Sequence, residues 1–384
     1  MSRSMWPWLR WCGFLSASLC VLACSTAGPS DRVAEPEAER GVESAGPSAP
    51  PVPVSFDAAE AAAEKLPRLR SLLVDRRGDL VVERYFNGAN PRRPANIKSA
   101  SKAVISALVG IAIERGLIPG VDAPIGPFFP KLLAGEADAA KRAITIQDLL
   151  TMRSGLESTS SRNYGAWVHS SNWVRHALSR RLVGMPGDGM RYSTGNTHLL
   201  SAILTNVSGK STWEFARDAL ARPLGFELAR WPRDPQGIYF GGNDMEMTPR
   251  QMMTFGKLYL AGGQTEGSQV VPADWITKSF VPRTRSRRSH RLYGYGWWIR
   301  DLGGCLTYYA WGFGGQFIFV IPELETVVVA TSSDAPGGQR HDHREELYDL
   351  VAQHVIAPIK NSEAPRPGTI PLAEPRETTS GANP

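Results

Sequence analysis

The stretch Ser99-Ala100-Ser101-Lys102, followed by the apolar run Ala103–Ile113, is the most informative part of this chain. Lys102 is the only lysine in the sequence with a serine three residues before it. Three residues are nearly one helical turn, so both side chains leave the same face of a helix. A serine hydroxyl beside a lysine amine is one of the few arrangements that make serine a nucleophile without histidine. Ser-x-x-Lys also arises by chance, and serine is a common helix N-cap.

The helix after this motif decides between these two interpretations. The run Ala103–Ile113 is apolar on nearly every side, which predicts a buried helix rather than an amphipathic one. A lysine at the start of a buried helix must be paired or neutral. Burial lowers the pKa of a lysine below its usual value of about 10.4, and a neutral amine can accept the serine proton. We therefore expect Ser99 to be a nucleophile and Lys102 its base.

Length and charge exclude few functions on their own. The chain has 384 residues and a formal net charge of +6, which is typical of one large soluble domain or two small ones. Basic residues cluster at Arg283, Arg285, Arg287, Arg288 and Arg291. Nothing like a nucleic-acid-binding module accompanies this cluster, so we interpret it as a solvated loop and expect no nucleic-acid partner.

The N-terminus resembles a bacterial lipoprotein signal. Arg3 and Arg10 are followed by an apolar run that is short for a membrane span and ends Val21-Leu22-Ala23-Cys24-Ser25. The resemblance implies a signal peptide over residues 1–24, lipidation of Cys24, and a chain anchored in the bacterial cell envelope, facing the periplasm or exterior. Leu22 stands where a small residue is more usual. An ordinary signal peptide cut nearby is the alternative, and it also places the mature chain outside the cytoplasm.

The remaining cysteine argues against two other kinds of site. With Cys12 and Cys20 removed with the signal and Cys24 lipidated, Cys305 is left alone, so no internal disulfide is expected. No metal-ligand spacing is present either, and neither a metal nor an organic cofactor is expected. The sequence also lacks a Gly-x-Ser-x-Gly elbow, which disfavours a Ser–His–Asp hydrolase.

Composition divides the rest of the chain. Residues 25–62 are rich in Pro, Ala, Glu, Ser and Gly, which predicts a disordered tether, and residues 362–384 read as a similar tail. The folded domain is therefore expected over 63–361, with a mainly helical lobe over about 120–262. Strand-like runs are Leu69–Asp75, Leu80–Phe86, Tyr293–Arg300, Leu306–Trp311, Gln316–Ile321 and Thr326–Thr331. Strands at both ends of the domain predict an α+β fold, an antiparallel β-sheet flanked by helices with an inserted helical lobe.

A serine–lysine pair also needs a second proton carrier and donors for the oxyanion. Tyr192 begins Tyr-Ser-Thr-Gly before a predicted helix, and positive neighbours would favour loss or transfer of its phenolic proton. Most tyrosines, however, are simply buried with one hydrogen bond. Glycines in the run Ala310–Gln316 would let a backbone N–H approach a ligand closely, although a plain hairpin turn explains this run equally well.

Together these motifs resemble those of the serine β-lactamase and penicillin-binding protein superfamily. The matching elements, in order, are Ser99-Ala-Ser-Lys102, Ile144–Thr151 with Ser154-Gly155-Leu156, Tyr192-Ser-Thr-Gly and Trp311-Gly-Phe-Gly-Gly. The chain is most similar to the class C-like branch, which includes family VIII carboxylesterases and 6-aminohexanoate-dimer hydrolases. The resemblance covers about residues 65–360, and the combination is specific although each motif alone is weak.

The resemblance assigns roles by position. Ser99 resembles the family nucleophile, Lys102 its general base, and Tyr192 the tyrosine that relays protons to the leaving group. The backbone N–H groups of Ser99 and Phe313 would form the oxyanion hole. Tyr164 lies in a segment that resembles a substrate-covering loop.

Two departures from the family pattern bear on the substrate. Thr194 stands where the Tyr-x-Asn motif has asparagine, and Asn196 is a candidate replacement. Ala310-Trp311-Gly312 stands where the family has Lys-Thr-Gly, whose lysine meets the substrate carboxylate in lactam-binding members. We expect the apolar rim at Trp311 and Gly312 to suit an ester or a linear amide better than an antibiotic.

The sequence thus predicts a serine hydrolase that cleaves a small-molecule ester or linear amide through an acyl-enzyme on Ser99. Two alternatives stay open. Within the same chemistry, the chain is a cell-wall peptidase or a weak β-lactamase. In a different class, it is a non-catalytic binding lipoprotein that has kept the fold, although the presence of all three catalytic side chains argues against this.

Overall fold

The computed structural model describes residues 54–135, 139–335 and 340–362. The predicted signal peptide with Cys24, most of the predicted tether and residues 363–384 lie outside these ranges. Among the described residues, none of the helices has both the length and the apolar character needed to span a bilayer.

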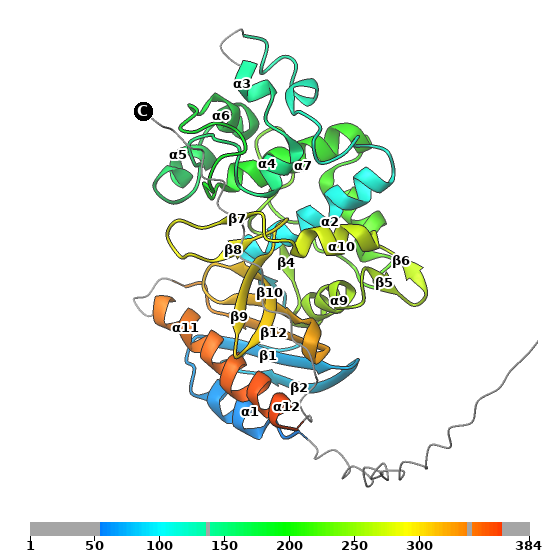
Figure 1. The fold of residues 1–384 in the computed structure, drawn as a ribbon, viewed down its shortest axis with the longest axis vertical. Helices are drawn as coiled ribbons and strands as arrows, with labels where there is room; N and C mark the ends of the chain where they lie inside the picture. Colours follow the sequence, from blue (N-terminus) through cyan, green and yellow to red (C-terminus); the bar gives the residue numbers. More distant parts are fainter. Residues whose placement is uncertain (1–53, 136–138, 336–339, 363–384) are drawn as a thin grey trace, which may run out of the picture. The chain divides into compact units, whose positions relative to one another are not determined.

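An eight-stranded antiparallel sheet organises the described part of the chain (Figure 1). Its order is β2-β1-β12-β11-β10-β9-β8-β7, so that β1 from the start of the domain pairs with β12 near its end. The predicted α+β fold is therefore confirmed. The strands are β1 (Leu69–Arg76), β2 (Asp79–Tyr85), β7 (Thr284–Arg285), β8 (Leu292–Tyr293), β9 (Trp298–Leu302), β10 (Cys305–Gly312), β11 (Gln316–Ile321) and β12 (Thr326–Ser332).

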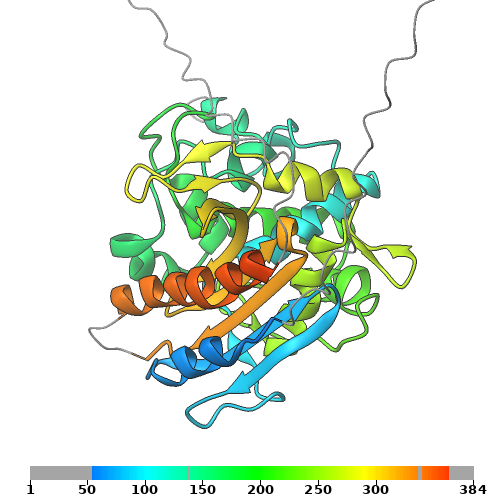
Figure 2. The same ribbon diagram turned by 60° about the horizontal axis from the view of Figure 1, so that its bottom comes forward.

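The two faces of the sheet are covered by different helices. One face carries α1 (Asp57–Glu64), α11 (Arg340–Val351) and α12 (Ala357–Ser362), with a π-helical turn at Ala352–Ile356, and Figure 2 shows α11 and α1 lying across the strands. The other face packs against α2 (Ser101–Glu114), α9 (Pro249–Leu260) and α10 (Ala273–Phe280). Because helices cover both faces, β11 and β12 are buried along their whole length.

The predicted tether ends earlier than expected. The sequence interpretation placed residues 25–62 in a disordered segment, and this prediction is wrong from residue 57, where α1 begins. Ala59 and Ala63, four residues apart on one helix face, are completely buried beside the sheet. Alanine has the highest helix propensity, so an Ala-rich composition that resembles a linker also suits a closely packed helix.

The predicted strand Tyr293–Arg300 is divided into β8 and β9. The chain turns between them at Gly296, which has a positive φ of 84°. A Cβ at Gly296 would lie 2.8 Å from the carbonyl oxygen of Lys102, so the turn is pressed against the first turn of α2. This contact between distant segments could not be seen in the strand-like composition.

The helical lobe lies in the chain between α2 and α9 and supplies the other wall of the site. Its helices are α3 (Ala139–Arg142), α4 (Ile146–Leu150), α5 (Tyr164–Val168), α6 (Trp173–Ser179), α7 (Thr194–Ser208) and α8 (Thr212–Ala216). The lobe also contains short helical turns at Gly126–Phe128, Ser161–Asn163 and Arg217–Ala221. Outside the main sheet, β3 (Ala95–Asn96) pairs with the distant β4 (Glu246–Met247), and β5 (Gln264–Thr265) forms a hairpin with β6 (Ser268–Gln269).

Candidate active site

Ser99 and Lys102 lie in contact at the start of α2. Ser99 is in a one-turn 3-10 helix, Lys98–Ala100, that leads directly into α2. Lys102 Nζ lies 3.1 Å from Ser99 Oγ, and the whole Lys102 residue is only 1% exposed. Every residue of α2 from Ser101 to Ala112 is buried, as the apolar pattern predicted. The helix therefore places a buried amine beside the hydroxyl of the partly exposed Ser99.

Burial controls the charge of Lys102. It lowers the pKa of the Lys102 ammonium to about 7, although the negative charge of Asp244 acts in the opposite direction. Lys102 Nζ also donates to the carbonyl oxygen of Gly242 at 2.5 Å and to Thr194 Oγ1 at 3.4 Å. A neutral amine has two N–H groups and one lone pair. When these two oxygens take the N–H groups, the lone pair is left for the Ser99 hydroxyl, which is the orientation a base requires.

Lys98, four residues earlier, is in the opposite electrostatic situation. Its Nζ lies 3.3 Å from Asp244 Oδ1 and 2.9 Å from Asp334 Oδ2. Burial alone would lower the pKa of Lys98, but the hydrogen bond and ion pair with Asp334 and the charge of Asp244 outweigh it, and the pKa is raised. Lys98 therefore stays charged and paired, whereas Lys102 can become neutral.

The backbone at Lys98 is also unusual. Its φ is 50°, a left-handed conformation that costs a residue other than glycine about 1–3 kcal/mol. The Lys98 N–H donates to Asn96 Oδ1 at 3.0 Å, and the two ion pairs hold the side chain. These contacts fix the chain direction immediately before Ser99.

Tyr192 completes the group of titratable side chains. Its ring centroid lies 5.0 Å from Lys102 Nζ, and the ring stacks on Trp298 at 6.0 Å with an interplanar angle of 18°. Burial raises the pKa of Tyr192 to about 12, although hydrogen bonding with Ser99 lowers it. The sequence interpretation expected positive neighbours to favour loss or transfer of the phenolic proton; burial acts in the opposite direction to a positive charge and favours the neutral phenol.

The segment that carries Tyr192 is held by hydrogen bonds from residues 158–160. Ser158 Oγ donates to the Tyr192 carbonyl at 2.6 Å, and the Thr159 N–H donates to Ser193 Oγ at 3.1 Å. Ser160 Oγ and Thr194 Oγ1 share a hydrogen bond of 3.0 Å. Because Lys102 also reaches Thr194, this ladder connects the start of α7 to the amine.

The candidate oxyanion hole lies where the end of β10 meets the chain before Ser99. A Cβ at Gly312 would lie only 2.1 Å from the carbonyl oxygen of Ile97, so glycine is required for this approach. Phe313 follows in the turn to β11 with its side chain 50% exposed. This approach brings the segment that carries Phe313 close to the chain before Ser99, and the assignment of their backbone N–H groups to the oxyanion hole stays a prediction.

Comparison with known proteins agrees with this geometry. The model of the Beta-lactamase family matches residues 70–353, which is most of the chain. This chain belongs to the Beta-lactamase family. The predicted superfamily is thereby confirmed, and the chain is a member of a hydrolase family with the β-lactamase fold.

Individual relatives of this family member are distant. It is 23% identical over 301 residues to the 6-aminohexanoate-dimer hydrolase of Paenarthrobacter ureafaciens, covering 71% of this chain and 74% of the relative. A candidate 6-aminohexanoate-dimer hydrolase from Bacillus anthracis has 22% identity and a TM-score of 0.63, over 76% of this chain and 80% of that one. EstCE1, a hydrolase with promiscuous acyltransferase activity, has 16% identity and a TM-score of 0.64, over 77% and 98%. At these identities the two structures show a shared fold only.

The positions that depart from the family pattern are now located. Thr194, in place of the family asparagine, contacts Lys102. Asn196 lies two residues further on α7, is 2% exposed, and accepts from Ser154 Oγ at 3.0 Å. Its amide nitrogen is buried and has no partner within the described residues. In the run Ala310-Trp311-Gly312, which stands in place of the family Lys-Thr-Gly, Ala310 occupies the lysine position and is buried, and Trp311 is partly buried beside Trp298, with ring centroids 6.4 Å apart.

Tyr164 lies on α5 and closes over a segment that the sequence interpretation missed, Gly241–Asp244. The Asn243 amide donates to the Tyr164 hydroxyl at 2.7 Å. Burial raises the pKa of Tyr164 to about 12, so its hydroxyl is neutral. Gly242 binds Lys102 and Asp244 binds Lys98, so two residues of this segment, separated only by Asn243, contact the two lysines. The sequence feature that could have indicated this segment is the pair of adjacent glycines before Asn-Asp, Gly241-Gly242-Asn243-Asp244.

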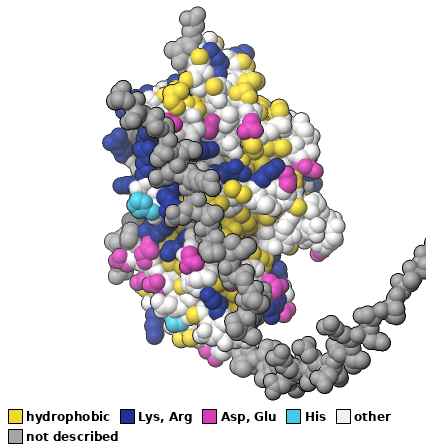
Figure 3. Space-filling view, in the orientation of Figure 1, with side chains coloured by type: hydrophobic (Ala, Val, Ile, Leu, Met, Phe, Trp, Pro, Cys, Tyr) yellow, Lys and Arg dark blue, Asp and Glu magenta, His cyan; other side chains and the backbone are white. Residues whose placement is uncertain are grey.

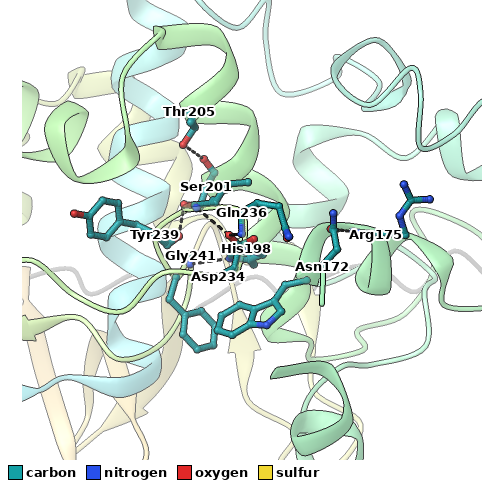
Figure 4. A network of polar contacts seen from close by, with 12 residues as sticks. Asn172, Arg175, His198, Ser201, Thr205, Asp234, Gln236, Tyr239 and Gly241 are labelled. Atoms are coloured by element: carbon teal, nitrogen blue, oxygen red, sulfur yellow. Dashed lines mark hydrogen bonds and ion pairs between the residues drawn. The ribbon is translucent and has the colours of Figure 1, made fainter. Parts of the chain in front are cut away.

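A buried polar network holds the segment in place from behind (Figure 4). His198, on α7, accepts from the Gly241 N–H through Nδ1 at 3.4 Å, and its Nε2 lies 3.1 Å from Asp234 Oδ2. Both side chains are fully buried. The other Asp234 oxygen accepts from the backbone N–H groups of Gln236 and Ile238, each at 2.9 Å. Since Nδ1 accepts, Nε2 carries the proton that is donated to Asp234.

Proposed function

We propose that this chain is a serine hydrolase that cleaves an ester or a linear amide through an acyl-enzyme on Ser99. The observation that carries the proposal is the 3.1 Å contact between Ser99 Oγ and Lys102 Nζ, a buried amine with a pKa of about 7. A lysine with this pKa is half neutral near physiological pH, which is the condition for a general base.

Acylation begins with proton transfer from the Ser99 hydroxyl to the neutral Lys102 amine. Ser99 Oγ forms a bond to the substrate carbonyl carbon, and the negative charge moves to the carbonyl oxygen, facing the N–H groups of Ser99 and Phe313. Collapse of this intermediate breaks the bond to the leaving group. Tyr192 protonates the leaving alcohol or amine and recovers a proton from the Lys102 ammonium, so the proton taken from Ser99 leaves with the product.

Deacylation reverses the proton path. A water molecule attacks the acyl carbon and gives its proton to the Tyr192–Lys102 pair, which returns one proton to Ser99 Oγ as the acid leaves. The high pKa of Tyr192, about 12, keeps the phenol protonated between turnovers. Tyr192 therefore relays a proton rather than acting as a standing base.

The composition of the rim supports an ester or a linear amide over a β-lactam. The position of the lactam-binding lysine is occupied within Ala310-Trp311-Gly312, which offers no ammonium group. The Paenarthrobacter relative acts, by its name, on a linear amide dimer, and EstCE1 is a hydrolase with acyltransferase activity. A cell-wall peptidase or weak β-lactamase is the alternative within the same chemistry, and stable labelling by a fluorescent penicillin would favour it.

The test compares Ser99→Ala with Ser106→Ala. Ser106 lies four residues after Lys102 on α2. Its hydroxyl is buried without a partner among the described residues, so its removal should leave the site intact. We expect a fluorophosphonate probe to add covalently to Ser99 in the wild type and in Ser106→Ala, and ester hydrolysis to be lost only in Ser99→Ala. Full activity in Ser99→Ala would refute the mechanism. No adduct at Ser99 would instead support a non-catalytic binding lipoprotein.

The cellular location is a separate part of the proposal. Cys24 in the context Val21-Leu22-Ala23-Cys24-Ser25 supports a lipid anchor that holds the chain on a membrane of the cell envelope. Cys24→Ala should release the protein into the soluble fraction, whereas the matched Cys20→Ala should not. Unchanged membrane retention of Cys24→Ala would contradict the anchor.

A further inference from the structure

A cleft of ≈ 770 Å³ opens beside Tyr192 and carries an excess of positive charge. This volume is within the range of about 300–1,000 Å³ that is usual for small-molecule sites. Its charged lining consists of five guanidinium groups and one carboxylate: Arg162, Arg181, Arg191, Arg287, Arg288 and Glu157. Figure 3 shows Lys and Arg side chains gathered along the left edge of this face, at the level of α5 and the β7–β8 hairpin in Figure 1.

The single carboxylate in the cleft is already paired. Glu157 Oε2 lies 2.5 Å from the guanidinium of Arg180 and 3.6 Å from that of Arg181. No ion pair joins Arg162, Arg287 or Arg288 to an acidic side chain in the part of the chain that the structure describes. The cleft therefore holds positive charge that the described residues do not neutralise.

The cluster that the sequence interpretation assigned to a solvated loop separates into two groups. Arg283 stacks on Tyr295 at 4.3 Å, and Arg291 pairs with Glu345 at 3.2 Å, so these two arginines have structural contacts. Arg287 and Arg288, both exposed in the loop between β7 and β8, line the cleft instead. A Cβ at Gly189 would lie 3.0 Å from an Arg287 guanidinium nitrogen, so Arg287 lies across the segment that leads to Tyr192.

The cleft reaches the catalytic group at Tyr192. Tyr192, Ser158 and Ser160 also line it, and Ser160 is hydrogen-bonded to Thr194, which Lys102 contacts. Arg191, next to Tyr192, is fixed by donation of its guanidinium to the Val183 carbonyl at 2.6 Å. A ligand in this cleft thus approaches the reacting atoms from the side of Tyr192, the residue that protonates the leaving group in the proposed mechanism.

We infer that the cleft binds a carboxylate carried by the leaving group, so that the preferred substrate is an ester or linear amide whose alcohol or amine half is an acid anion. This inference rests on the proposed function and names its substrate class. Guanidinium groups bind carboxylates in a bidentate manner, and a cleft lined by one sign of charge concentrates ligands of the opposite sign. The guanidinium groups beside Tyr192 would also supply the positive charge that Ala310, at the position of the family lysine, does not supply.

The experiment uses esters that differ only in where the charge is placed. One pair is the acetate ester of 3-(4-hydroxyphenyl)propanoate and that of its neutral primary amide, which have nearly the same phenol. A second pair, phenyl hydrogen adipate and phenyl hexanoate, places the carboxylate on the acyl half. The quantity compared is the ratio of kcat/KM for the charged and the neutral ester, so that general effects of a substitution cancel.

We expect the carboxylate on the leaving group to raise kcat/KM about tenfold at low salt, which corresponds to about 1.4 kcal/mol. The ratio should fall towards one in 0.5 M NaCl and in the double variant Arg287→Gln/Arg288→Gln, because screening and loss of the guanidinium groups remove the same attraction. Arg175→Gln/Arg92→Gln removes the same charge from exposed positions outside the cleft and should keep the ratio.

Three results would overturn the inference: a ratio near one in the wild type, a ratio that survives in Arg287→Gln/Arg288→Gln, or a larger preference for the carboxylate on the acyl half. Each of these can occur while the neutral ester is still hydrolysed through Ser99, so the proposed function would stand. Conversely, neutral-ester hydrolysis that persists in Ser99→Ala would refute the proposed function itself.

Discussion

The Gly242 carbonyl oxygen accepts a hydrogen bond of 2.5 Å from Lys102 Nζ, although the two residues are 140 positions apart in the chain. This contact orients the amine, because an N–H directed at Gly242 leaves the lone pair towards Ser99. Gly242 has no room for a side chain: a Cβ would lie 2.1 Å from Thr197 Oγ1 and 3.1 Å from Lys102 Nζ. Control of the base therefore depends on a glycine outside the Ser-x-x-Lys motif.

Gly242→Ala should consequently lower kcat without removing the nucleophile. The added methyl group displaces the carbonyl from Lys102, and misplacement of a base by about 1 Å can reduce the rate about a hundredfold. The control is Gly120→Ala, where a Cβ meets nothing within 4 Å. Ester hydrolysis and thermal stability would be measured for both. Wild-type kcat in Gly242→Ala would show that the hydrogen bond does not orient Lys102.

The pH dependence of acylation should report the pKa of Lys102. The base must be neutral, so kcat/KM should rise about tenfold per pH unit below pH 7 and level off above it. No second ionisation should intervene up to about pH 10, because the pKa of Tyr192 is about 12. A pH–rate profile with its lower inflection near 10 would contradict a neutral lysine base.

Two aspartates provide the matched pair for this profile. Asp244 raises the pKa of Lys102 through its charge, so Asp244→Asn should move the inflection to lower pH. Asp334 is the other partner of Lys98, and its charge is not among the influences on Lys102. Asp334→Asn should therefore leave the inflection where it is. Equal shifts in both variants would show that disturbance of Lys98, not the field at Lys102, is responsible.

The part of the site that is local in sequence could be predicted, and the part formed by distant segments could not. Ser99 and Lys102 are three residues apart on one helix, so helical geometry alone brings them together. The buried character of α2 likewise follows from its composition. The Gly241–Asp244 segment, in contrast, contacts Lys102 only because the lobe folds back, and its sequence contains no apolar period or cap that predicts this contact.

The charge states of Lys102 and Tyr192 also differ in how far the sequence predicts them. The sequence correctly indicates that Lys102 is desolvated, because an apolar helix surrounds it. The protonation state of Tyr192 depends on how deeply its phenol is buried, so the rise of its pKa to about 12 could not be predicted from the sequence. Composition misled in a similar way at α1, where an Ala-rich segment is a packed helix rather than a linker.

His198 should act as a positioning residue for the base. It contacts no reacting atom, but its Nδ1 holds the Gly241 N–H next to the carbonyl that binds Lys102. His198→Ala removes this contact and opens the buried network, so water should reach Lys102 and raise its pKa. We expect the inflection of the pH–rate profile to move upward, with about a tenfold loss at pH 6 for each pH unit of the shift. His198→Gln keeps a polar side chain, so its inflection should lie between those of His198→Ala and the wild type.

A general loss of stability must be distinguished from this effect. Thr205, on the same helix, donates to the Ser201 carbonyl and shares a hydrogen bond with Thr212, but contacts neither Gly241 nor Asp234 (Figure 4). Thr205→Ala should lower the melting temperature while the inflection stays in place. If both variants only lower the melting temperature, His198 is structural and does not position the base.

The oxyanion hole can be tested at a single backbone atom. Phe313→Pro deletes the N–H group that the resemblance assigns to the hole, whereas Phe313→Ala keeps it and removes only a side chain that is 50% exposed. Loss of one such donor typically lowers kcat about 10²–10³-fold. Because the charge on oxygen develops only in the transition state, KM should change little. Gly312→Ala should resemble Phe313→Pro, since its Cβ would push the turn away from the Ile97 carbonyl. Similar kcat values for Phe313→Pro and Phe313→Ala would exclude this N–H from the hole and require another donor opposite Ser99.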